Sequence, residues 1–516
     1  MRTFYTKYAK YSIGVIAVLF AAVSTVSAQV NTLYYMKTVA TRHEMNPSFQ
    51  PLPNSYYSIL PISSGMYIGA GNNSLALEDI IYPNRSGGEY KTVLFFNNEG
   101  NVADFYSRLK KTTQIYSEVD LRLFAMGIRM RNNSYLTIGL NTKSSANIFI
   151  PKDLAKLLIY GTPDTTGMNS FNLDRFGVRA SMYSELAVGY SRKIDSRLTV
   201  GAKIKLLAGH ANMITKIDRF RLNASREKWE FDIKGTVNMS IPNTEYELDE
   251  QRRIENMNIK PFDDFQFGNM IGGLGAAVDL GANYKLLDDR LTVSASLLDF
   301  GFIGWKSSNA SNIPVDGHFE FEGVDIEFKD GKANWDEDYF DNIQDNIDYT
   351  TTFESYMSSL AAKVMLGAEY GILNHRLTFG GLSKSTIVNK TVFQEITASV
   401  NYLPFNFFNA SLSYSLLNGR FGTVGLGLGG RLGPFNMYVA GDYMPVKYAK
   451  QYVPYKNKAF NLQMGLLLNF GYSAKKNADD DNDGVQNRND RCPDTPAGVL
   501  TDKYGCPTDT NAKNVE

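Results

Sequence analysis

The residues best suited to chemistry lie near the C-terminus, where carboxylate and amide oxygens recur at alternate positions. The candidate ligands are the side chains of Asp479, Asp481, Asp483, Asn487 and Asp490, together with the main-chain carbonyl of Val485. A hard cation such as Ca²⁺ takes about six to eight oxygen ligands, and a Gly in the middle of the loop allows the chain to turn around the ion. We therefore predict a structural calcium site. A solvated acidic linker without an ion is the alternative.

This acidic stretch is similar to a known repeat. An EF-hand would place Glu where Asp490 stands and would flank the loop with helices. Here a Cys-Pro pair follows at Cys492, and a Gly-Cys-Pro ends the stretch around Cys506. The Asp ladder with these two features resembles the thrombospondin type 3 repeat, except that Asn487 stands where Asp is usual and lowers the charge of the ligand set. The resemblance implies a disulfide between Cys492 and Cys506.

The same resemblance bears on the domain organisation. In bacteria this repeat commonly links an outer-membrane barrel to an OmpA-like peptidoglycan-binding domain. Residues 508–516 are too few to form such a domain. We therefore expect either a short form of such a protein or a truncated product, with the OmpA-like domain absent.

Other motifs do not lead to chemistry. Gly425, Gly427 and Gly430 match G-x-G-x-x-G, but dinucleotide binding requires a helix after these glycines. They alternate with apolar residues, so we interpret them as small residues facing the inside of a barrel. The four histidines show no metal-binding spacing, and His210, the only one near the end of an expected strand, has no G-x-S-x-G beside it. We predict no catalytic or cofactor-binding residues and no enzyme activity.

The N-terminus has the features of a secretory signal peptide. Basic residues at Arg2, Lys7 and Lys10 precede an apolar run over residues 13–23, and small residues end at Ala28. This pattern predicts export and cleavage after residue 28. An N-terminal anchor helix is the alternative.

The overall composition excludes several classes of protein. Lys plus Arg is 53 and Asp plus Glu is 53, so there is no basic excess to neutralise nucleic-acid phosphates. Beyond the signal peptide no run approaches the roughly 18 apolar residues of a transmembrane helix. Tyr and Phe number 31 each beside 43 Gly, which is typical of a β-rich chain. A transmembrane β-barrel remains possible, because its strands show only alternation.

Alternation of apolar and polar residues continues over residues 57–472. In the last segment Phe460, Met464 and Phe470 fall on one face of an extended strand, and polar residues fall on the other. A slip in phase near Phe124 predicts a β-bulge. Strands of about 10 residues with aromatic ends suit a membrane better than a soluble sandwich. The predicted fold is all-β, a transmembrane antiparallel barrel of about 14 strands.

The polar faces of these strands carry both signs of charge. A large soluble barrel would pack apolar residues inside, so these charges favour a polar lumen. The predicted lumen-facing charges are Arg179, Glu185, Lys203, Lys205, Asp279, Lys363, Glu369, Arg431 and Asp442.

Short and long joints alternate between the expected strands. Short turns, as at residues 194–196, alternate with long segments, as at residues 209–267 and 304–352. Bacterial outer-membrane barrels have short periplasmic turns and long external loops, and an even strand number places both termini in the periplasm. Within one long joint, residues 151–160 predict a short amphipathic helix.

These patterns divide the chain into six parts. We predict a signal peptide at residues 1–28, an N-terminal segment and possible plug at 29–56, the barrel at 57–472, a linker at 473–478, the calcium repeat at 479–507 and a disordered tail at 508–516.

The barrel resembles a group of uncharacterised outer-membrane proteins of Bacteroidota. The resemblance lies in the Tyr-rich strands, in the motif around Asn46-Pro47-Ser48 and in the appended repeat. The same three residues are similar to an Asn-Pro-Ala near the start of FadL-type channels and of type IX secretion accessory barrels. The last strand resembles the terminal signal that the barrel-assembly machinery reads.

Two functions are consistent with this architecture. The first is a porin-like outer-membrane channel that passes small solutes and has a calcium-stiffened periplasmic tail. The second is a non-conducting scaffold barrel, blocked by its loops or by residues 29–54, that links the cell envelope to periplasmic or surface protein partners. The expected partners of either are outer-membrane lipid and the assembly machinery.

Overall fold

The computed structural model describes the barrel and the segment that precedes it. The residues described are 30–59, 61, 63–75, 81–84, 91–94, 99–161, 169–225, 228–259, 270–287, 289–322, 327–329, 332–334, 349–373, 375–388, 391–405, 407–417, 420–444, 459–472, 485, 490–492, 495, 499 and 501–508. The predicted signal peptide, linker and extreme C-terminus lie outside these residues. No helix among them is long and apolar enough to cross a membrane.

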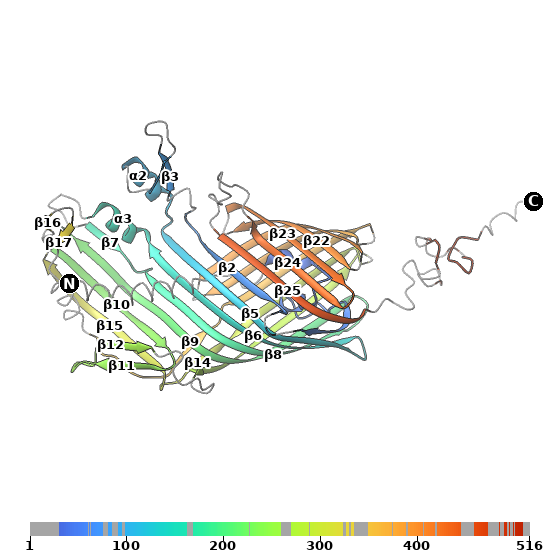
Figure 1. The fold of residues 1–516 in the computed structure, drawn as a ribbon, viewed down its shortest axis with the longest axis horizontal. Coiled ribbons are helices and arrows are strands. Elements are labelled where there is room, and N and C mark those ends of the chain that lie inside the picture. The colour runs from blue at the N-terminus through green and yellow to red at the C-terminus, as the bar shows by residue number, and fades with distance from the viewer. Residues whose placement is uncertain are drawn as a thin grey trace, which may run out of the picture.

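The chain forms a closed antiparallel barrel of 14 strands, as predicted (Figure 1). The first strand is interrupted, and its two parts both pair with the second and the last strand, which closes the barrel. In order around the barrel the strands are β1 (Pro53–Ser58) continued by β2 (Met66–Asn72), β5 (Thr112–Met130), β6 (Ser134–Pro151), β8 (Gly177–Lys193), β9 (Leu198–Ala224), β13 (Gly273–Leu286), β14 (Leu291–Trp305), β18 (Tyr356–Ser359) continued by β19 (Ala362–Ile372), β20 (Leu377–Val388), β21 (Thr391–Phe405), β22 (Phe408–Leu417), β23 (Arg420–Leu432), β24 (Phe435–Met444) and β25 (Ala459–Tyr472).

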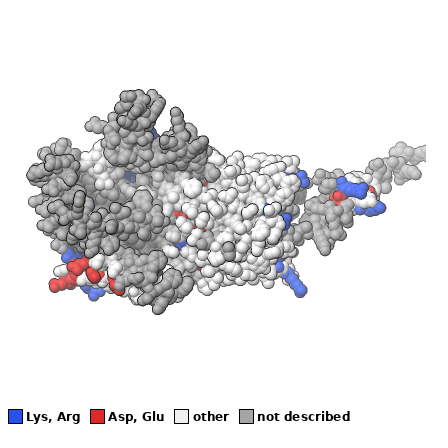
Figure 2. Space-filling view, viewed as in Figure 1, with Lys and Arg blue, Asp and Glu red and all other residues white. Residues whose placement is uncertain are grey.

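Alternation along each strand separates an apolar exterior from a polar interior. In β25, Phe460 and Phe470 are 44% and 46% exposed, whereas Asn461 and Asn469 are 1% and 3% exposed. The barrel wall at the right of Figure 2 is correspondingly free of charge, and Lys and Arg gather at its end. An apolar outer belt around a polar interior is the arrangement that a barrel needs in a bilayer.

Bulges interrupt the pairing of several strands, and two of them shift the alternation at residues that face the lumen. The pairing of β5 with β6 changes register between Arg122 and Phe124, so the bulge predicted near Phe124 is confirmed. A second bulge interrupts the pairing of β13 with β14 after Val278. It places Leu298 and Asp299 opposite Asp279, gives Asp299 a left-handed backbone (φ 55°) and turns the Asp299 side chain into the barrel.

Two predicted long loops, residues 209–267 and 304–352, are partly wrong, because the barrel wall continues into both of them. β9 runs on to Ala224, where it pairs with β10 (Lys228–Ser240), and β10 pairs with β15 (Ala310–Glu322). These strands carry cross-strand ion pairs, such as Arg219 with Asp232. A strand inside a membrane would have apolar residues at the same positions. The sequence therefore shows no clean alternation here, although cross-strand pairs hold the sheet. A hairpin of β11 (Thr244–Leu248) and β12 (Ile254–Ile259) follows β10.

The remaining small helices and strands lie within the long connections between barrel strands. The helix predicted over residues 151–160 is present as α3 (Lys152–Tyr160), and its Leu154 and Leu157 pack against a cluster that contains Phe171 and Leu222. The others are α2 (Glu99–Arg108), β3 (Ile81–Asn84), β4 (Lys91–Leu94), β7 (Asn169–Asn172), β16 (Glu327–Lys329) and β17 (Lys332–Asn334).

Short turns gather at the opposite end, where β25 finishes (Figure 1). In the turn between β8 and β9, backbone N–H groups of Leu198 and Arg197 donate to the Asp195 carboxylate at 2.7 and 2.6 Å. These bonds stabilise the ionised carboxylate and hold the pKa of Asp195 below its usual value. Because Pro53 pairs with Tyr472, the barrel begins and ends at this same end.

Candidate functional site

Residues 30–50, here called the N-terminal segment, lie inside the barrel near the end with the short turns (blue in Figure 1). The segment contains two 3₁₀ helices, η1 (Asn31–Tyr35) and η2 (Ala40–Glu44). Most of its side chains are buried, and Val30, Tyr34 and Met36 are 0% exposed. A segment this short has no core of its own, so its burial comes from the surrounding wall.

The first residues of the segment are held by carboxylates of the wall. Backbone N–H groups of Asn31 and Thr32 donate to the two oxygens of Asp442 in β24, at 2.5 and 2.9 Å, and the Thr32 hydroxyl donates to the same carboxylate at 2.6 Å. The Asn31 amide also donates to Glu395 in β21 at 2.6 Å. Glu395 is paired with Lys384 of β20 at 2.8 Å. Three strands, β20, β21 and β24, thus contribute to one anchor.

Two tyrosines at the end of η1 bind a further part of the wall. The Tyr35 hydroxyl lies 3.0 Å from the carbonyl of Ala368 and 2.5 Å from that of Gly381. The Tyr34 hydroxyl is 3.0 Å from the hydroxyl of Ser294. These contacts tie η1 to β14, β19 and β20.

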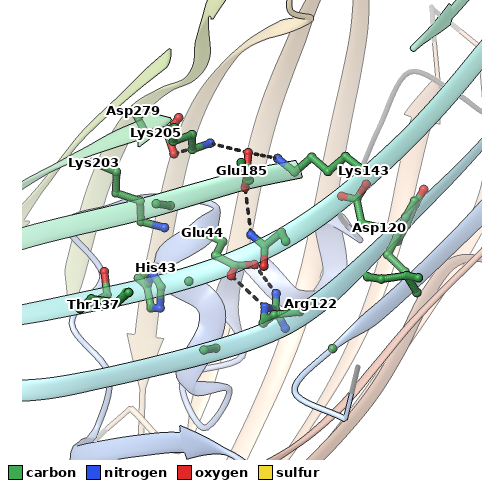
Figure 3. A pocket seen from close by; sticks show the side chains of 18 of the residues that line it. His43, Glu44, Asp120, Arg122, Thr137, Lys143, Glu185, Lys203, Lys205 and Asp279 are labelled. Atoms are coloured by element: carbon green, nitrogen blue, oxygen red, sulfur yellow. Dashed lines mark hydrogen bonds and ion pairs between the residues drawn. The ribbon is translucent and has the colours of Figure 1, made fainter. Parts of the chain in front are cut away.

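The second helix carries an ion pair with the wall (Figure 3). Glu44 accepts from two guanidinium nitrogens of Arg122 in β5, with 2.9 Å between Nε and Oε1. Arg122 also donates to the carbonyl of Ser64 at 2.6 Å, at the interruption between β1 and β2. His43 lies beside this pair, with its Nε2 at 2.5 Å from the Tyr56 hydroxyl.

The Asn46-Pro47-Ser48 motif forms the last part of the contact. The Asn46 amide donates to the carbonyl of Ala295 at 3.1 Å, and its oxygen accepts from the Ser48 backbone at 3.0 Å. Asn283 of β13 donates to the carbonyl of Ser48 at 3.1 Å. The motif therefore makes a local turn that is bonded to β13 and β14.

Glycines in the wall make room for the segment. A Cβ atom added at Gly281 would come within 3.0 Å of Asn46 and Pro47, and one at Gly427 would come within 3.0 Å of Met36. Gly425 faces the segment in the same way, at Thr32. These glycines accommodate the close approach of a second chain segment. Gly430 is an exception to our prediction, because the alternation places it on the outer face and Gly429 on the inner one.

Further from the short turns, the lumen contains a network of charged wall residues. Lys205 lies 2.8 Å from Asp279 and 2.6 Å from Asp299, and Lys143 lies 3.0 Å from Glu185 and 3.4 Å from Asp299. Lys363 reaches the other oxygen of Asp299 at 3.5 Å. All of these side chains are at most 13% exposed. The three lysines balance three carboxylates, so the network neutralises itself.

The structure places the nine predicted lumen charges in different settings. Four of them, Glu185, Lys205, Asp279 and Lys363, share the charged network. Asp442 binds the N-terminal segment as described above, and the others are distributed over the wall. Glu369 pairs with Lys37 of the segment at 3.0 Å, and Lys203 lines a cavity with His43 and Glu44. Arg179 donates to the carbonyl of Ser359 at 2.7 Å. Arg431 is half-buried near the end of β23.

Cavities remain inside the described barrel. One of about 200 Å³ lies between the N-terminal segment and the wall, lined by residues such as Tyr35, Arg42 and Glu369. Two smaller cavities, of about 40 and 70 Å³, lie between the segment, the charged network and the wall. Each has room for a few water molecules. The site is thus a polar lumen occupied by the protein's own N-terminal segment.

A known family model matches most of the barrel described above. The model of a family of unknown function, DUF5723, matches residues 47–442. The chain belongs to the DUF5723 family. The match spans the end of the N-terminal segment and most of the barrel, up to the anchoring Asp442.

Several solved barrels are similar to this DUF5723 chain. The toluene transporter TodX of Pseudomonas putida has 10% identity and a TM-score of 0.37, with 83% of this chain and 93% of that chain covered. The toluene transporter TbuX of Ralstonia pickettii has 7% identity and a TM-score of 0.36 at the same coverage. A FadL homologue of Pseudomonas aeruginosa has 9% identity, a TM-score of 0.34, and 87% and 96% coverage. The strand pairing described above, rather than these alignments, establishes the barrel.

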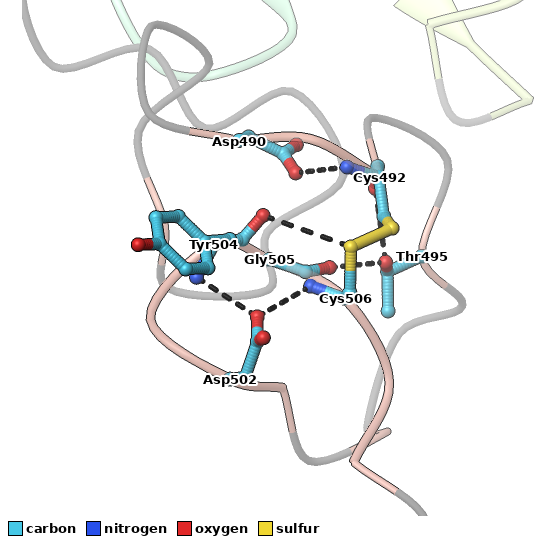
Figure 4. Close-up of a disulfide and its surroundings, with 7 residues drawn as sticks. All are labelled: Asp490, Cys492, Thr495, Asp502, Tyr504, Gly505 and Cys506. Carbon is cyan, nitrogen blue, oxygen red and sulfur yellow. Dashed lines mark hydrogen bonds between the residues drawn. A yellow bond between two sulfur atoms is a disulfide. The ribbon is translucent and has the colours of Figure 1, made fainter.

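The C-terminal module contains the disulfide between Cys492 and Cys506, whose Cα atoms are 5.0 Å apart (Figure 4). Of the six predicted calcium ligands, only Val485 and Asp490 fall within the described residues. One Asp490 oxygen accepts from the Cys492 backbone at 2.7 Å, and the other is buried without a hydrogen bond among the described atoms. No group of three metal-binding side chains occurs among the described residues.

Several important residues were missed from the sequence. Glu44 and Arg122 lie far apart in the chain, and nothing in the sequence around either residue points to the other. Asp299 could have been found, because the apolar positions shift from odd numbers up to Leu297 to even numbers from Phe300. Such a change of phase marks a bulge, and a charge at that point is turned inward.

Proposed function

We propose that this DUF5723 protein is an outer-membrane channel for small polar solutes that its N-terminal segment holds closed. The apolar outer belt, which outer-membrane lipid would cover, and the signal-like N-terminus support this location. The short turns then face the periplasm, as do both ends of the barrel. Folding into that membrane would require the barrel-assembly machinery.

One observation carries the proposal: the N-terminal segment is bonded to wall strands around the lumen. Its partners lie in β5, β13, β14, β19, β20, β21 and β24. These are hydrogen bonds and ion pairs, in each of which water could replace one partner. A segment held in this way closes the lumen but can be released.

The wall behind the segment suits a water-filled path. Residues that face inward in β21 and β22 are small and polar, including Thr397, Ser399, Ser411 and Ser413. Such a surface is readily hydrated, whereas a permanently packed core would be apolar. This polarity favours a channel over the alternative of a scaffold that never conducts.

The test is conductance of the refolded mature protein in a planar bilayer. We expect few openings in the wild type and steady ohmic steps after deletion of residues 30–50. A milder variant, Glu44→Ala with Asp442→Ala, should raise the frequency of opening, and Asp316→Ala on an exposed ion pair should leave it unchanged. A folded deletion variant that does not conduct would refute the channel and favour the scaffold.

We further propose that residues 479–490 bind a structural Ca²⁺ that stiffens the periplasmic tail. The buried, unsatisfied oxygen of Asp490 supports this, since a cation would satisfy it. The ligands would be those predicted from the sequence, and the disulfide beside them holds the end of the loop. Calcium should therefore protect the residues after Ala478 from proteolysis. The double variant Asp481→Ala, Asp483→Ala should lose this protection, and unchanged protection would refute the metal site.

A further inference from the structure

We propose a second site, on the outer face of the barrel, where Ser184 and His210 form a nucleophile and base for hydrolysis of membrane-lipid esters. The Ser184 hydroxyl lies 2.7 Å from Nε2 of His210, and Nδ1 of the same ring lies 3.1 Å from the carbonyl of Met270. A hydroxyl bonded to an imidazole that a third group orients is the geometry of an activated serine. The site is independent of the N-terminal segment.

A β-bulge brings the two side chains together. Tyr183 pairs with Gly209 and Met182 pairs with Ala211, so His210 is the extra residue of the bulge and has no partner in β8. Bulges commonly re-aim a side chain beside an active site. Ser184 lies between Tyr183 and Glu185, which face the lumen, and so points to the outside.

With a neutral His210 ring, the hydrogen bonds allow only one placement of protons. The carbonyl of Met270 can only accept, so Nδ1 of His210 carries the ring proton and Nε2 has the lone pair. The Ser184 hydroxyl must then donate to Nε2. Thr142, whose hydroxyl is 2.9 Å from that of Ser184, must donate to the Ser184 oxygen. This is the arrangement that a general base requires before it takes the serine proton.

The surroundings indicate an acyl ester as substrate. Ser184 and His210 are half-buried in the outer belt, and Met182, Leu206 and Leu274 near them are 40%, 61% and 60% exposed. Ser184 lies nine residues before the end of β8. At about 3.3 Å per residue and a tilt of about 40°, this is about 23 Å above the short turns, near the far edge of an apolar band about 25 Å tall. In the proposed orientation, this is where the ester groups of outer-leaflet lipids lie.

The reaction balances without a cofactor. The Ser184 oxygen would attack the ester carbonyl while His210 takes its proton, and His210 would return that proton to the departing alcohol as the ester C–O bond breaks. Water would then cleave the acyl-serine in the same way and release a fatty acid. Thr142, whose hydroxyl lies 2.9 Å from that of Ser184, would supply a donor to the developing oxyanion. A single hydroxyl replaces the usual pair of backbone donors, so slow turnover is expected.

The first experiment treats the full-length mature protein in detergent micelles with a long-chain alkyl fluorophosphonate and locates the modified residue by peptide mass spectrometry. We expect modification at Ser184. It should be absent in Ser184→Ala and about 100-fold slower in His210→Gln, which keeps a polar side chain but cannot act as a base. The matched control is Ser181→Ala, which changes a serine of the same strand that lines a lumen cavity.

The second experiment measures fatty-acid release from a phospholipid with a fluorescent acyl chain. Release should be lost in Ser184→Ala and about 100-fold slower in Thr142→Val. Each variant is first shown to be folded by its heat-dependent mobility on gels, and Ser184→Ala should keep wild-type conductance. Folded wild type that neither reacts at Ser184 nor releases fatty acid would overturn the proposal. So would release by Ser184→Ala at the wild-type rate.

Discussion

The lumen of the barrel is filled in two different ways. Near the short turns it holds the N-terminal segment, packed through aromatic and aliphatic side chains such as Tyr34, Tyr35 and Met36. Further along, it holds ion pairs between side chains of the wall itself, centred on Lys205 and Asp299. Both regions are buried, and both contain charged contacts.

The two regions differ in whether their contents can leave the lumen without disrupting the barrel wall. The N-terminal segment is one continuous piece of chain that could leave as a unit, and the wall behind it would hydrate. The charged network belongs to six strands of the barrel, and removing one member would leave another charge buried without a partner. We therefore expect changes in the first region to alter permeability and changes in the second to alter stability.

The largest expected effect is on the charged network. Lys205→Met should lower the free energy of unfolding by about 3–5 kcal/mol, because Asp279 and Asp299 would lose their closest cation in a buried site. Urea unfolding of the barrel in detergent measures this loss. Lys234→Met is the control: its partner Asp316 is 62% exposed, so the loss should stay below about 1 kcal/mol. Equal losses in the two variants would contradict the comparison.

A glycine substitution should act on the first region. Gly281→Leu places a side chain where Asn46 and Pro47 lie, and such overpacking costs about 1–3 kcal/mol. The segment should detach, so trypsin should cleave at Lys37 and Arg42 and channel openings should increase. Gly381→Leu, where an added Cβ meets no atom within 4 Å, should change neither measurement. Protection of both cleavage sites in folded Gly281→Leu would show that the segment does not yield.

A change at the anchor should have a smaller effect of the same kind. Asp442→Asn removes the charge that accepts from the Asn31 and Thr32 backbones, and hydrogen bonds to charged groups contribute about 1.5–3 kcal/mol. We expect brief openings in single-channel recordings, while urea unfolding of the barrel stays close to wild type. Combined with deletion of residues 30–50, the substitution should add nothing. An additive effect would mean that Asp442 acts on the wall and not on the segment.

The smallest effect concerns pH at the short turn between β8 and β9. The pKa of Asp195 is lowered in the folded protein by the Leu198 and Arg197 N–H groups. Its contribution to stability is therefore present above the unfolded pKa of about 3.9 and is lost as the pH falls through the lower, folded pKa. Asp195→Asn should remove this part of the acid dependence of unfolding and leave conductance unchanged. An unaltered pH profile would contradict the role of the turn.

Prediction from the sequence was most successful where local periodicity decides the structure. The barrel, its strand number and the bulge near Phe124 follow from alternation, which depends only on neighbouring residues. The wall beyond residue 209 was mistaken for a loop, because cross-strand ion pairs replaced apolar residues there. The calcium ligands and the closing role of residues 29–54 remain proposals.

The sequence by itself determined which side chains face lipid and which face inward, because a strand alternates with period two and a bilayer admits only apolar groups. Only the tertiary structure decided what the inward side chains contact. The pairs of Glu44 with Arg122 and of Ser184 with His210 each join residues from different elements, and the second also needs a bulge to align them. Closure of the barrel determines the distances between such side chains, and no local sequence pattern predicts them.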